Sequence, residues 1–170
     1  MVVWIIGLSG AGKTTLAEAV AAQLRKAGGS AVLIDGDRIR DLFDNDLGHT
    51  IDDRRRNGAR ICKLGKFLDE QNVHVVCAIL SLFPEQREWN RENLKDYLEV
   101  FIDAPLADLK ARDSKGLYRR FESGEIRDVA GLDIEFPRPS HADIVIPNDA
   151  SRAALLAYAK PIADRMLGNS

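Results

Sequence analysis

The feature that most constrains the fold is a glycine-rich segment at residues 7–14, which reads GLSGAGKT and matches the pattern G-x-x-x-x-G-K-[ST]. It follows a short apolar run at residues 2–6. It precedes an Ala- and Leu-rich stretch over residues 13–27 with helical spacing, which ends at a glycine pair. A strand, a tight turn and a helix in this order hold phosphate groups in many proteins. The segment therefore predicts a P-loop within an α/β fold.

Each residue type in this segment has a chemical role in a P-loop. Glycines let the backbone curve until successive N–H groups face an anion, Lys13 reaches the outer phosphates, and the Thr14 hydroxyl is a ligand for Mg²⁺. The alternative, a glycine-rich turn that only ends a strand, is disfavoured by the strand and helix on either side. The ATP-binding residues that we predict are Gly7, Ser9, Gly10, Ala11, Gly12, Lys13, Thr14 and Thr15.

Short β-branched runs recur along the chain and predict the rest of the sheet. They lie at residues 2–6, 31–34, 73–79, 99–102 and 144–146, and most are separated by stretches with helical spacing. Because these runs are apolar on nearly every residue, they suit strands covered on both faces. We expect one domain over residues 1–170, a three-layer α/β sandwich with a mainly parallel five-stranded sheet, helices on both faces and a lid.

Composition and charge limit the kind of partner. The 170 residues include 24 Lys and Arg against 26 Asp and Glu. A broad basic surface for a nucleic acid polymer or a membrane is therefore not expected, and we expect small ligands. Cys62 and Cys77 lie in apolar periodic runs and are predicted to be buried thiols, not a disulfide or metal pair. Residues 2–6 are too short for a secretory signal or a membrane span, so we expect a cytoplasmic protein.

A second long helix is predicted to begin near Thr50, where Thr50 and Asp53 have the spacing of a capping box. Beyond it, a stripe with spacings of three and four starts at the polar Arg54 and Asn57 and becomes apolar at Ile61. Arg54 and Asn57 are polar, yet they share the inward face of the helix with the apolar members. The N-terminal end of this helix is therefore predicted to border a cleft. The alternative is that both polar side chains are solvated near a frayed helix end.

Three further segments have the composition of a ligand site. Asp35 and Asp37 follow the second strand at the edge where ligands collect in open α/β sheets, although an ordinary polar turn is the alternative. Residues 110–120 hold five cations and one acid, which predicts a lid over a transferring phosphate or, alternatively, a solvated helix face. Residues 122–143 have no clear period and are predicted to form a lid or a binding loop.

The motifs that the chain lacks limit the class of nucleotide-binding protein to which it can belong. No N-K-x-D or T-K-x-D segment is present, which disfavours a guanine-nucleotide switch. The third apolar run ends in ILS at residues 79–81, without the magnesium-binding Asp typical of motor and transporter ATPases. The class that remains is a small P-loop kinase, which binds its second substrate opposite the P-loop. A nucleotide-binding regulatory module without an acceptor is the alternative.

Over nearly the whole chain, these residues resemble the adenylylsulfate kinases, also called APS kinases. The matching segments are GLSGAGKTT at 7–15, DGD at 35–37 with Arg40, NDLG at 45–48, DRxxN at 53–57, DAPL at 103–106, RD at 112–113, KGLY at 115–118, GEI at 124–126 and GLD at 131–133. The resemblance implies a P-loop kinase fold and transfer of the γ-phosphate of ATP to the 3′-hydroxyl of a nucleotide ribose. It also implies Mg²⁺ as the cofactor and a homodimer.

The resemblance implies roles for individual residues. Lys13 and Thr14 would serve ATP and Mg²⁺, and Asp37 would orient or deprotonate the acceptor hydroxyl, with Asp35 near the metal through water. Lys115 would come from the lid, so Lys13, Asp37 and Lys115 form the implied catalytic set. The implied acceptor-binding residues are Asp35, Asp37, Arg40, His49, Arg54, Asn57, Ser81, Lys115 and Val129.

The chain departs from the family pattern around the acceptor. His49 and Val129 stand where the family has two Phe residues that sandwich adenine, and the family's AFISPYR becomes AILSLFP at residues 78–84. We therefore expect adenylylsulfate to be a poorer acceptor than another nucleotide. A branch resembling this family phosphorylates cytidine diphosphoramidate for capsule modification, and a smaller pyrimidine suits a pocket without two Phe residues. Cytidine diphosphoramidate is therefore the alternative acceptor.

Overall fold

The centre of the fold is a parallel sheet, described here from a computed structural model that covers residues 1–113, 115–148 and 151–168. Its strands are β1 (Val2–Ile6), β2 (Ala31–Asp35), β3 (His74–Ile79), β4 (Tyr97–Asp103) and β5 (Ile144–Pro147). They pair in the order β2-β3-β1-β4-β5, and every pairing is parallel. The predicted α/β fold class is confirmed, and the sheet expected to be mainly parallel is entirely so.

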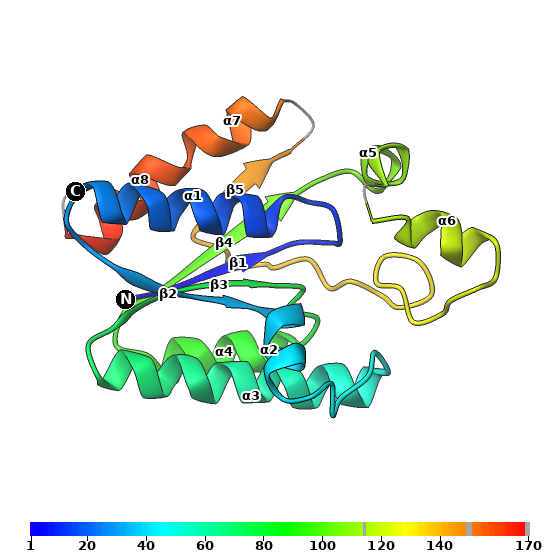
Figure 1. Ribbon diagram of the computed structural model, residues 1–170, viewed down its shortest axis with the longest axis horizontal. Helices are drawn as coiled ribbons and strands as arrows, with labels where there is room; N and C mark the ends of the chain where they lie inside the picture. Colours follow the sequence, from blue (N-terminus) through cyan, green and yellow to red (C-terminus); the bar gives the residue numbers. More distant parts are fainter. Residues whose placement is uncertain (114, 149–150, 169–170) are drawn as a thin grey trace.

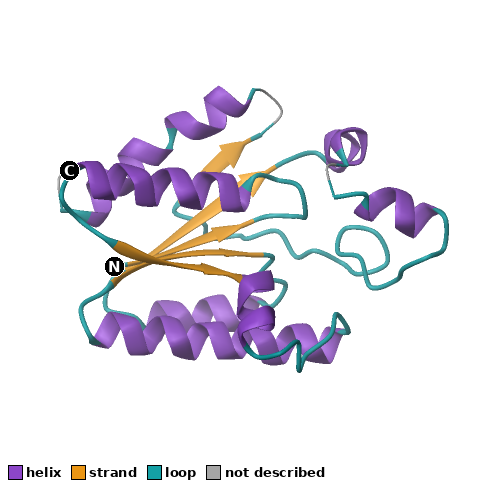
Figure 2. Cartoon of the chain, viewed as in Figure 1, coloured by secondary structure: helices purple, strands orange, loops and turns teal. Residues whose placement is uncertain are grey.

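Helices surround this sheet. They are α1 (Lys13–Lys26), α2 (Gly36–Leu42), α3 (Ile51–Glu70), α4 (Pro84–Asn93), α5 (Leu106–Arg112), α6 (Leu117–Glu122), α7 (Arg152–Ala157) and α8 (Ala159–Met166). Helices α1, α7 and α8 lie on one face and α3 and α4 on the other (Figure 1). Helices α5 and α6 extend beyond the carboxyl ends of the strands (Figure 2). In the described ranges, no helix is long and apolar enough to cross a membrane.

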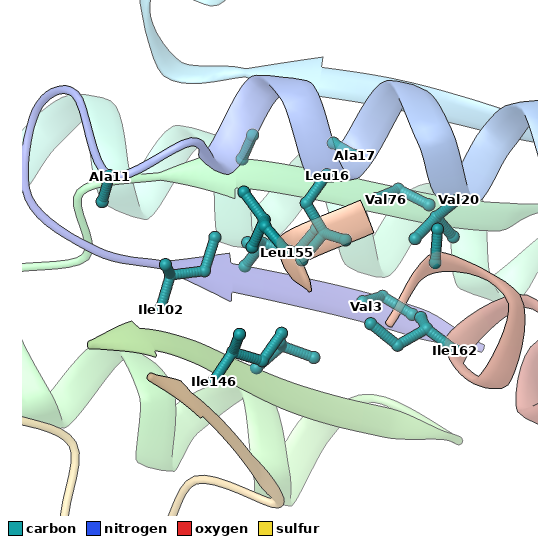
Figure 3. Close-up of a cluster of buried hydrophobic side chains, with 14 of the residues drawn as sticks. Val3, Ala11, Leu16, Ala17, Val20, Val76, Ile102, Ile146, Leu155 and Ile162 are labelled. Atoms are coloured by element: carbon teal, nitrogen blue, oxygen red, sulfur yellow. The ribbon is translucent and has the colours of Figure 1, made fainter. Parts of the chain in front are cut away.

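The core explains why the strands are apolar on nearly every residue. All five residues of β1 are buried, because both of its faces are covered. On one face, Val3 and Val76 of the sheet pack with Leu16 and Val20 of α1 and with Ile162 of α8 (Figure 3). This packing fixes α1, and with it the P-loop, against the middle of the sheet.

A second apolar cluster lies on the opposite face, between the sheet and α3. It includes Trp4 of β1, Ile61 of α3 and Phe101 of β4. Both cysteines, Cys62 and Cys77, belong to this cluster as free thiols. Burial raises the pKa of Cys62 to about 12, so this thiol is not reactive at neutral pH. The prediction of two buried thiols is confirmed.

Helix α3 begins where the sequence predicts. The Thr50 hydroxyl accepts a hydrogen bond from the Asp53 N–H at 3.2 Å, and it donates to the Asp53 carboxylate at 2.9 Å. One orphan N–H of the first turn is thereby satisfied. Further along the helix, Ile61 is buried, while Arg54 and Asn57 line a cleft. The prediction that the polar members of the stripe border a cleft is confirmed.

Removal of this cap should destabilise the protein. Thr50→Ala is expected to lower the free energy of unfolding by about 1 kcal/mol, because an N–H of the first turn loses its acceptor. In a chain of this size that change lowers Tm by about 2–4 °C. Thermal denaturation measures the difference, and Thr50→Ser, which keeps the hydroxyl, is the control. Equal Tm values for the Ala and Ser variants would show that the cap contributes nothing.

Two features of the fold differ from the sequence analysis. Helix α2 was not predicted, yet the Asp35 carboxylate accepts a hydrogen bond from the Asp37 N–H at 2.9 Å and so caps this helix. Seven residues directly after a strand are too few for helical spacing to be visible. The C-terminal helical stretch is divided at Tyr158 into α7 and α8, and Pro161 occupies the first turn of α8, where its missing N–H costs no hydrogen bond.

Candidate active site

A large cleft with a volume of about 750 Å³ opens at the carboxyl ends of the strands. Its walls come from the P-loop, the N-terminal parts of α2 and α3, the segment after β3, the predicted lid, and the loop that follows the lid as far as residue 130. All residues that the sequence analysis assigns to ATP, acceptor or metal line this cleft, with the exception of Gly7 and Ala11. The structure therefore brings together side chains from segments that are far apart in the sequence.

Gly7 and Ala11 are the two buried residues of the P-loop. Ala11 is fully buried, and its N–H donates to the Leu8 carbonyl at 3.2 Å. A Cβ atom on Gly7 would lie 3.0 Å from the carbonyl oxygen of Ile102, so glycine allows the loop to pack closely on β4. Close packing explains why both residues are small. Their contact with ATP stays a prediction.

The P-loop is held in its conformation by distant side chains. The φ angles of Gly10 and Gly12 are 79° and 91°, in the left-handed region that favours glycine. The Tyr118 hydroxyl donates to the Ser9 carbonyl, and Asn148 Nδ2 donates to the Ala11 carbonyl, both at 2.9 Å. Sequence patterns predict no role for Tyr118 or Asn148 in holding the P-loop. The available signal was that Asn148 directly follows β5, at the same edge of the sheet.

Lys13 and Thr14 begin α1 beneath the cleft. Lys13 Nζ donates to a main-chain carbonyl of the P-loop at 2.9 Å, which holds the ammonium over the loop. Burial, and then the charge of Lys115, lowers the pKa of Lys13 to about 8, while Asp35 and Asp37 act in the opposite direction. Thr14 Oγ1 donates to the Asp35 carboxylate at 2.8 Å. A hydroxyl and a carboxylate oxygen therefore lie side by side next to Lys13.

Asp37 lies in the first turn of α2 and faces the lid. Its carboxylate is 3.5 Å from Lys115 Nζ and 3.7 Å from a guanidinium nitrogen of Arg40. The side chains of Asp37 and Lys115 are 67% and 65% exposed, so this ion pair contributes little to stability and both groups stay accessible. Lys13 lines the same cleft as Asp37 and Lys115, so the three predicted catalytic residues lie together.

The opposite half of the cleft has a polar wall. Arg54 donates to the main-chain carbonyls of His49 and Asp128, each at 2.7 Å. Burial, followed by the charge of Arg40, lowers the pKa of Arg54. Asn57 is only 3% exposed, and its Oδ1 atom has no hydrogen-bond partner in the described part of the chain. The alternative that Arg54 and Asn57 are merely solvated is wrong.

The remaining predicted acceptor residues differ in character. His49 is exposed, whereas Val129 is 3% exposed and packs against the core, and both border the cleft. Ser81 also lines the cleft, and its hydroxyl accepts a hydrogen bond from the Trp4 indole at 3.1 Å. Ser81 is therefore anchored to β1 and shapes the wall.

The lid cations are mostly paired within the lid. Lys110, Arg119 and Arg120 each form an ion pair with an acidic residue of the same region. Of the five predicted lid cations, Lys115 and Arg120 line the cleft. The role predicted for residues 110–120, a lid over the transferring phosphate, therefore applies to Lys115 and Arg120. Lys110 and Arg119 fit the alternative of a solvated helix face.

Comparison with known proteins agrees with this geometry. The family model described as Adenylylsulphate kinase matches residues 1–147. The chain belongs to this family. An adenylyl-sulfate kinase of Erwinia tasmaniensis is 40% identical over 145 residues, which are 84% of this chain and 72% of that protein. A cytidine diphosphoramidate kinase of Campylobacter jejuni is 37% identical over 150 residues, which are 86% of this chain and 85% of that protein.

A solved structure of the adenylylsulfate kinase family has the same fold. The Mycobacterium tuberculosis APS kinase CysC in complex with AMPPNP and APS superposes with a TM-score of 0.87 at 34% identity, over 98% of this chain and 96% of that chain. The chain is therefore an ATP-binding kinase of the adenylylsulfate kinase family. Since its relatives carry names for two different acceptors, family membership leaves the acceptor open.

Proposed function

We propose that this kinase transfers the γ-phosphate of ATP to the 3′-hydroxyl of a nucleotide acceptor. The observation that carries the proposal is the position of Asp37, whose carboxylate lies 3.5 Å from Lys115 in the cleft that Lys13 also lines. Arg54 and Asn57 line the other half of this cleft and suit the phosphate end of a second nucleotide. A module that only binds a nucleotide does not need a carboxylate and a second cation at this position.

The chemistry follows from these positions. Asp37 would accept the proton of the attacking hydroxyl. As the hydroxyl oxygen bonds to the γ-phosphorus, the bond from that phosphorus to the bridging oxygen of ATP breaks, and ADP leaves. Negative charge spreads over the transferring oxygens, where Lys13 and Lys115 would stabilise it from the P-loop and the lid.

Thr14 and Asp35 offer oxygen atoms of the kind that Mg²⁺ prefers. Their side chains lie 2.8 Å apart beside Lys13. Within the described ranges, no group of three or more His, Cys, Asp and Glu side chains is arranged to hold a metal. This donor set fits an ion bound by the Thr14 hydroxyl, phosphate oxygens and water, with Asp35 bound through water. Bound Mg²⁺ would neutralise charge on the β- and γ-phosphates.

The acceptor half favours a base smaller than adenine. His49 offers one partial stacking surface, and Val129 offers only apolar contact. We therefore propose that adenylylsulfate is a poor acceptor and that a cytidine diphosphate derivative such as cytidine diphosphoramidate is a better one. ADP release from ATP and Mg²⁺ with each candidate tests the choice. A strong preference of the unmodified protein for adenylylsulfate would contradict it and leave adenylylsulfate kinase as the activity.

Restoring two aromatic rings should favour adenine. The double variant His49→Phe, Val129→Phe is expected to gain in kcat/KM for adenylylsulfate. Stacking on one ring contributes about 1 to 3 kcal/mol, so two rings correspond to about 30-fold or more in affinity. The single variant His49→Phe is the control, because Val129 packs against the core and a larger side chain there strains it. Thermal denaturation checks each fold, and the absence of any gain in folded variants would contradict the stacking explanation.

A further inference from the structure

Asp128 is an acidic residue of the acceptor half that the proposed chemistry does not use. It lines the cleft immediately before Val129. Its carbonyl accepts a hydrogen bond from Arg54 at 2.7 Å, and its N–H donates to Asp133 at 2.8 Å. Both of these bonds involve the main chain. Its carboxylate has no hydrogen-bond or ion-pair partner in residues 1–113, 115–148 and 151–168.

The main chain of Asp128 is firmly held. The Asp133 carboxylate accepts hydrogen bonds from two consecutive N–H groups, those of Asp128 at 2.8 Å and Val129 at 2.6 Å. Arg54 binds the carbonyl on the other side. The φ angle of Asp128 is 61°, in the left-handed region that Asp and Asn tolerate better than most residues. The carboxylate is therefore presented from a fixed position.

The surroundings of this carboxylate indicate what it binds. Burial and the charge of Arg40 lower the pKa of Arg54, while Asp128 opposes them, so the Asp128 carboxylate acts on Arg54 within the cleft. A carboxylate only accepts hydrogen bonds, and it repels the phosphate groups that Arg54 would attract. It therefore suits a neutral N–H or O–H donor of the acceptor. Because Asp37 would take the reacting hydroxyl, and because Val129 and His49 would border the base, the matching donor would be on the base.

We propose that Asp128 recognises the base of the acceptor by accepting a hydrogen bond from an exocyclic amino group. Cytosine and adenine carry such a group, whereas uracil and hypoxanthine present a carbonyl at the same position. A carboxylate facing that carbonyl would be left without a donor, which costs binding free energy. The inference rests on the proposed function and adds to it that the kinase selects an amino-bearing base.

The test compares acceptors that differ only in this group. The unmodified kinase is expected to show kcat/KM at least about 10-fold higher for cytidine diphosphate than for uridine diphosphate, the range for one specific base contact. Asp128→Asn is expected to bring the ratio close to 1, because an amide can either accept from the amine or donate to the carbonyl. Glu135→Gln removes a negative charge from an exposed position on the same loop and should leave the ratio unchanged. If only a purine is turned over, adenylylsulfate and its inosine counterpart give the same comparison.

The ratio of kcat/KM for the two acceptors distinguishes a role of Asp128 in base recognition from a role in stability. Asn tolerates the left-handed conformation, and a purely structural role would lower turnover of both acceptors equally. A ratio near 1 in the unmodified kinase, or an unchanged ratio in Asp128→Asn, would overturn the inference while the kinase proposal stands. The absence of ADP release with every nucleotide would overturn both.

Discussion

Lys13→Ala is expected to lower kcat by at least about 100-fold in a protein that still folds, the range for loss of one preorganised charge at a phosphoryl transition state. Lys13 Nζ is held over the P-loop by its bond to a loop carbonyl, where the outer phosphates of ATP are expected. Its pKa is lowered to about 8, chiefly by burial. The phosphates of bound ATP would favour the charged form of Lys13 and oppose this shift in pKa. The ammonium would therefore be charged during phosphate transfer.

Steady-state kinetics with saturating acceptor measures the effect of Lys13→Ala. Lys63→Ala is the control, because Lys63 lies on the exposed side of α3, outside the residues that line the cleft. Thermal denaturation establishes that both variants fold. Near-normal turnover in folded Lys13→Ala would contradict the role of the P-loop lysine, whatever the acceptor.

Asp37→Asn is expected to lower kcat by about 10²- to 10⁴-fold, the range for a general base, with little change in the KM for ATP. The carboxylate faces Lys115 at 3.5 Å and is 67% exposed, so its loss removes the proposed base without disturbing the core. The cap of α2 is kept, because it uses the Asp37 N–H and the Asp35 carboxylate.

The kinetic pattern decides how Asp37 acts. Initial rates over a range of ATP concentrations separate kcat from KM, and Asp41→Asn, an exposed acid on the same helix that does not line the cleft, is the control. A raised KM for ATP at unchanged kcat would mean that Asp37 binds ATP and takes no part in the chemistry.

Local sequence patterns were sufficient for most of the fold. Strands covered on both faces are apolar on nearly every residue, as the five buried residues of β1 show. The P-loop has a fixed spacing and context, and the cap at Thr50 is a contact between residues three apart. For the same reason, the stripe that begins at Arg54 and Asn57 indicated which end of α3 borders the cleft.

Contacts between distant segments were not visible in the sequence. Tyr118 and Asn148 bond to P-loop carbonyls 109 and 137 positions away, and no local period encodes such pairs. The pairing of Lys110 and Arg119 with nearby acids also depends on how the lid folds, so charge alone overstated the number of cations facing the cleft. Asp128 went unnoticed because only its position in the cleft makes its carboxylate informative.

The transfer of the γ-phosphate itself tests the proposed function most directly. The kinase is incubated with Mg²⁺, ATP labelled on its γ-phosphate, and each nucleotide acceptor in turn, and the products are separated. The label is expected on the acceptor as a phosphomonoester of the ribose 3′-hydroxyl, in an amount equal to the ADP formed, and Asp37→Asn should suppress it. Label found only in ATP and inorganic phosphate, with every acceptor, would contradict the assignment of this cleft to nucleotide phosphorylation.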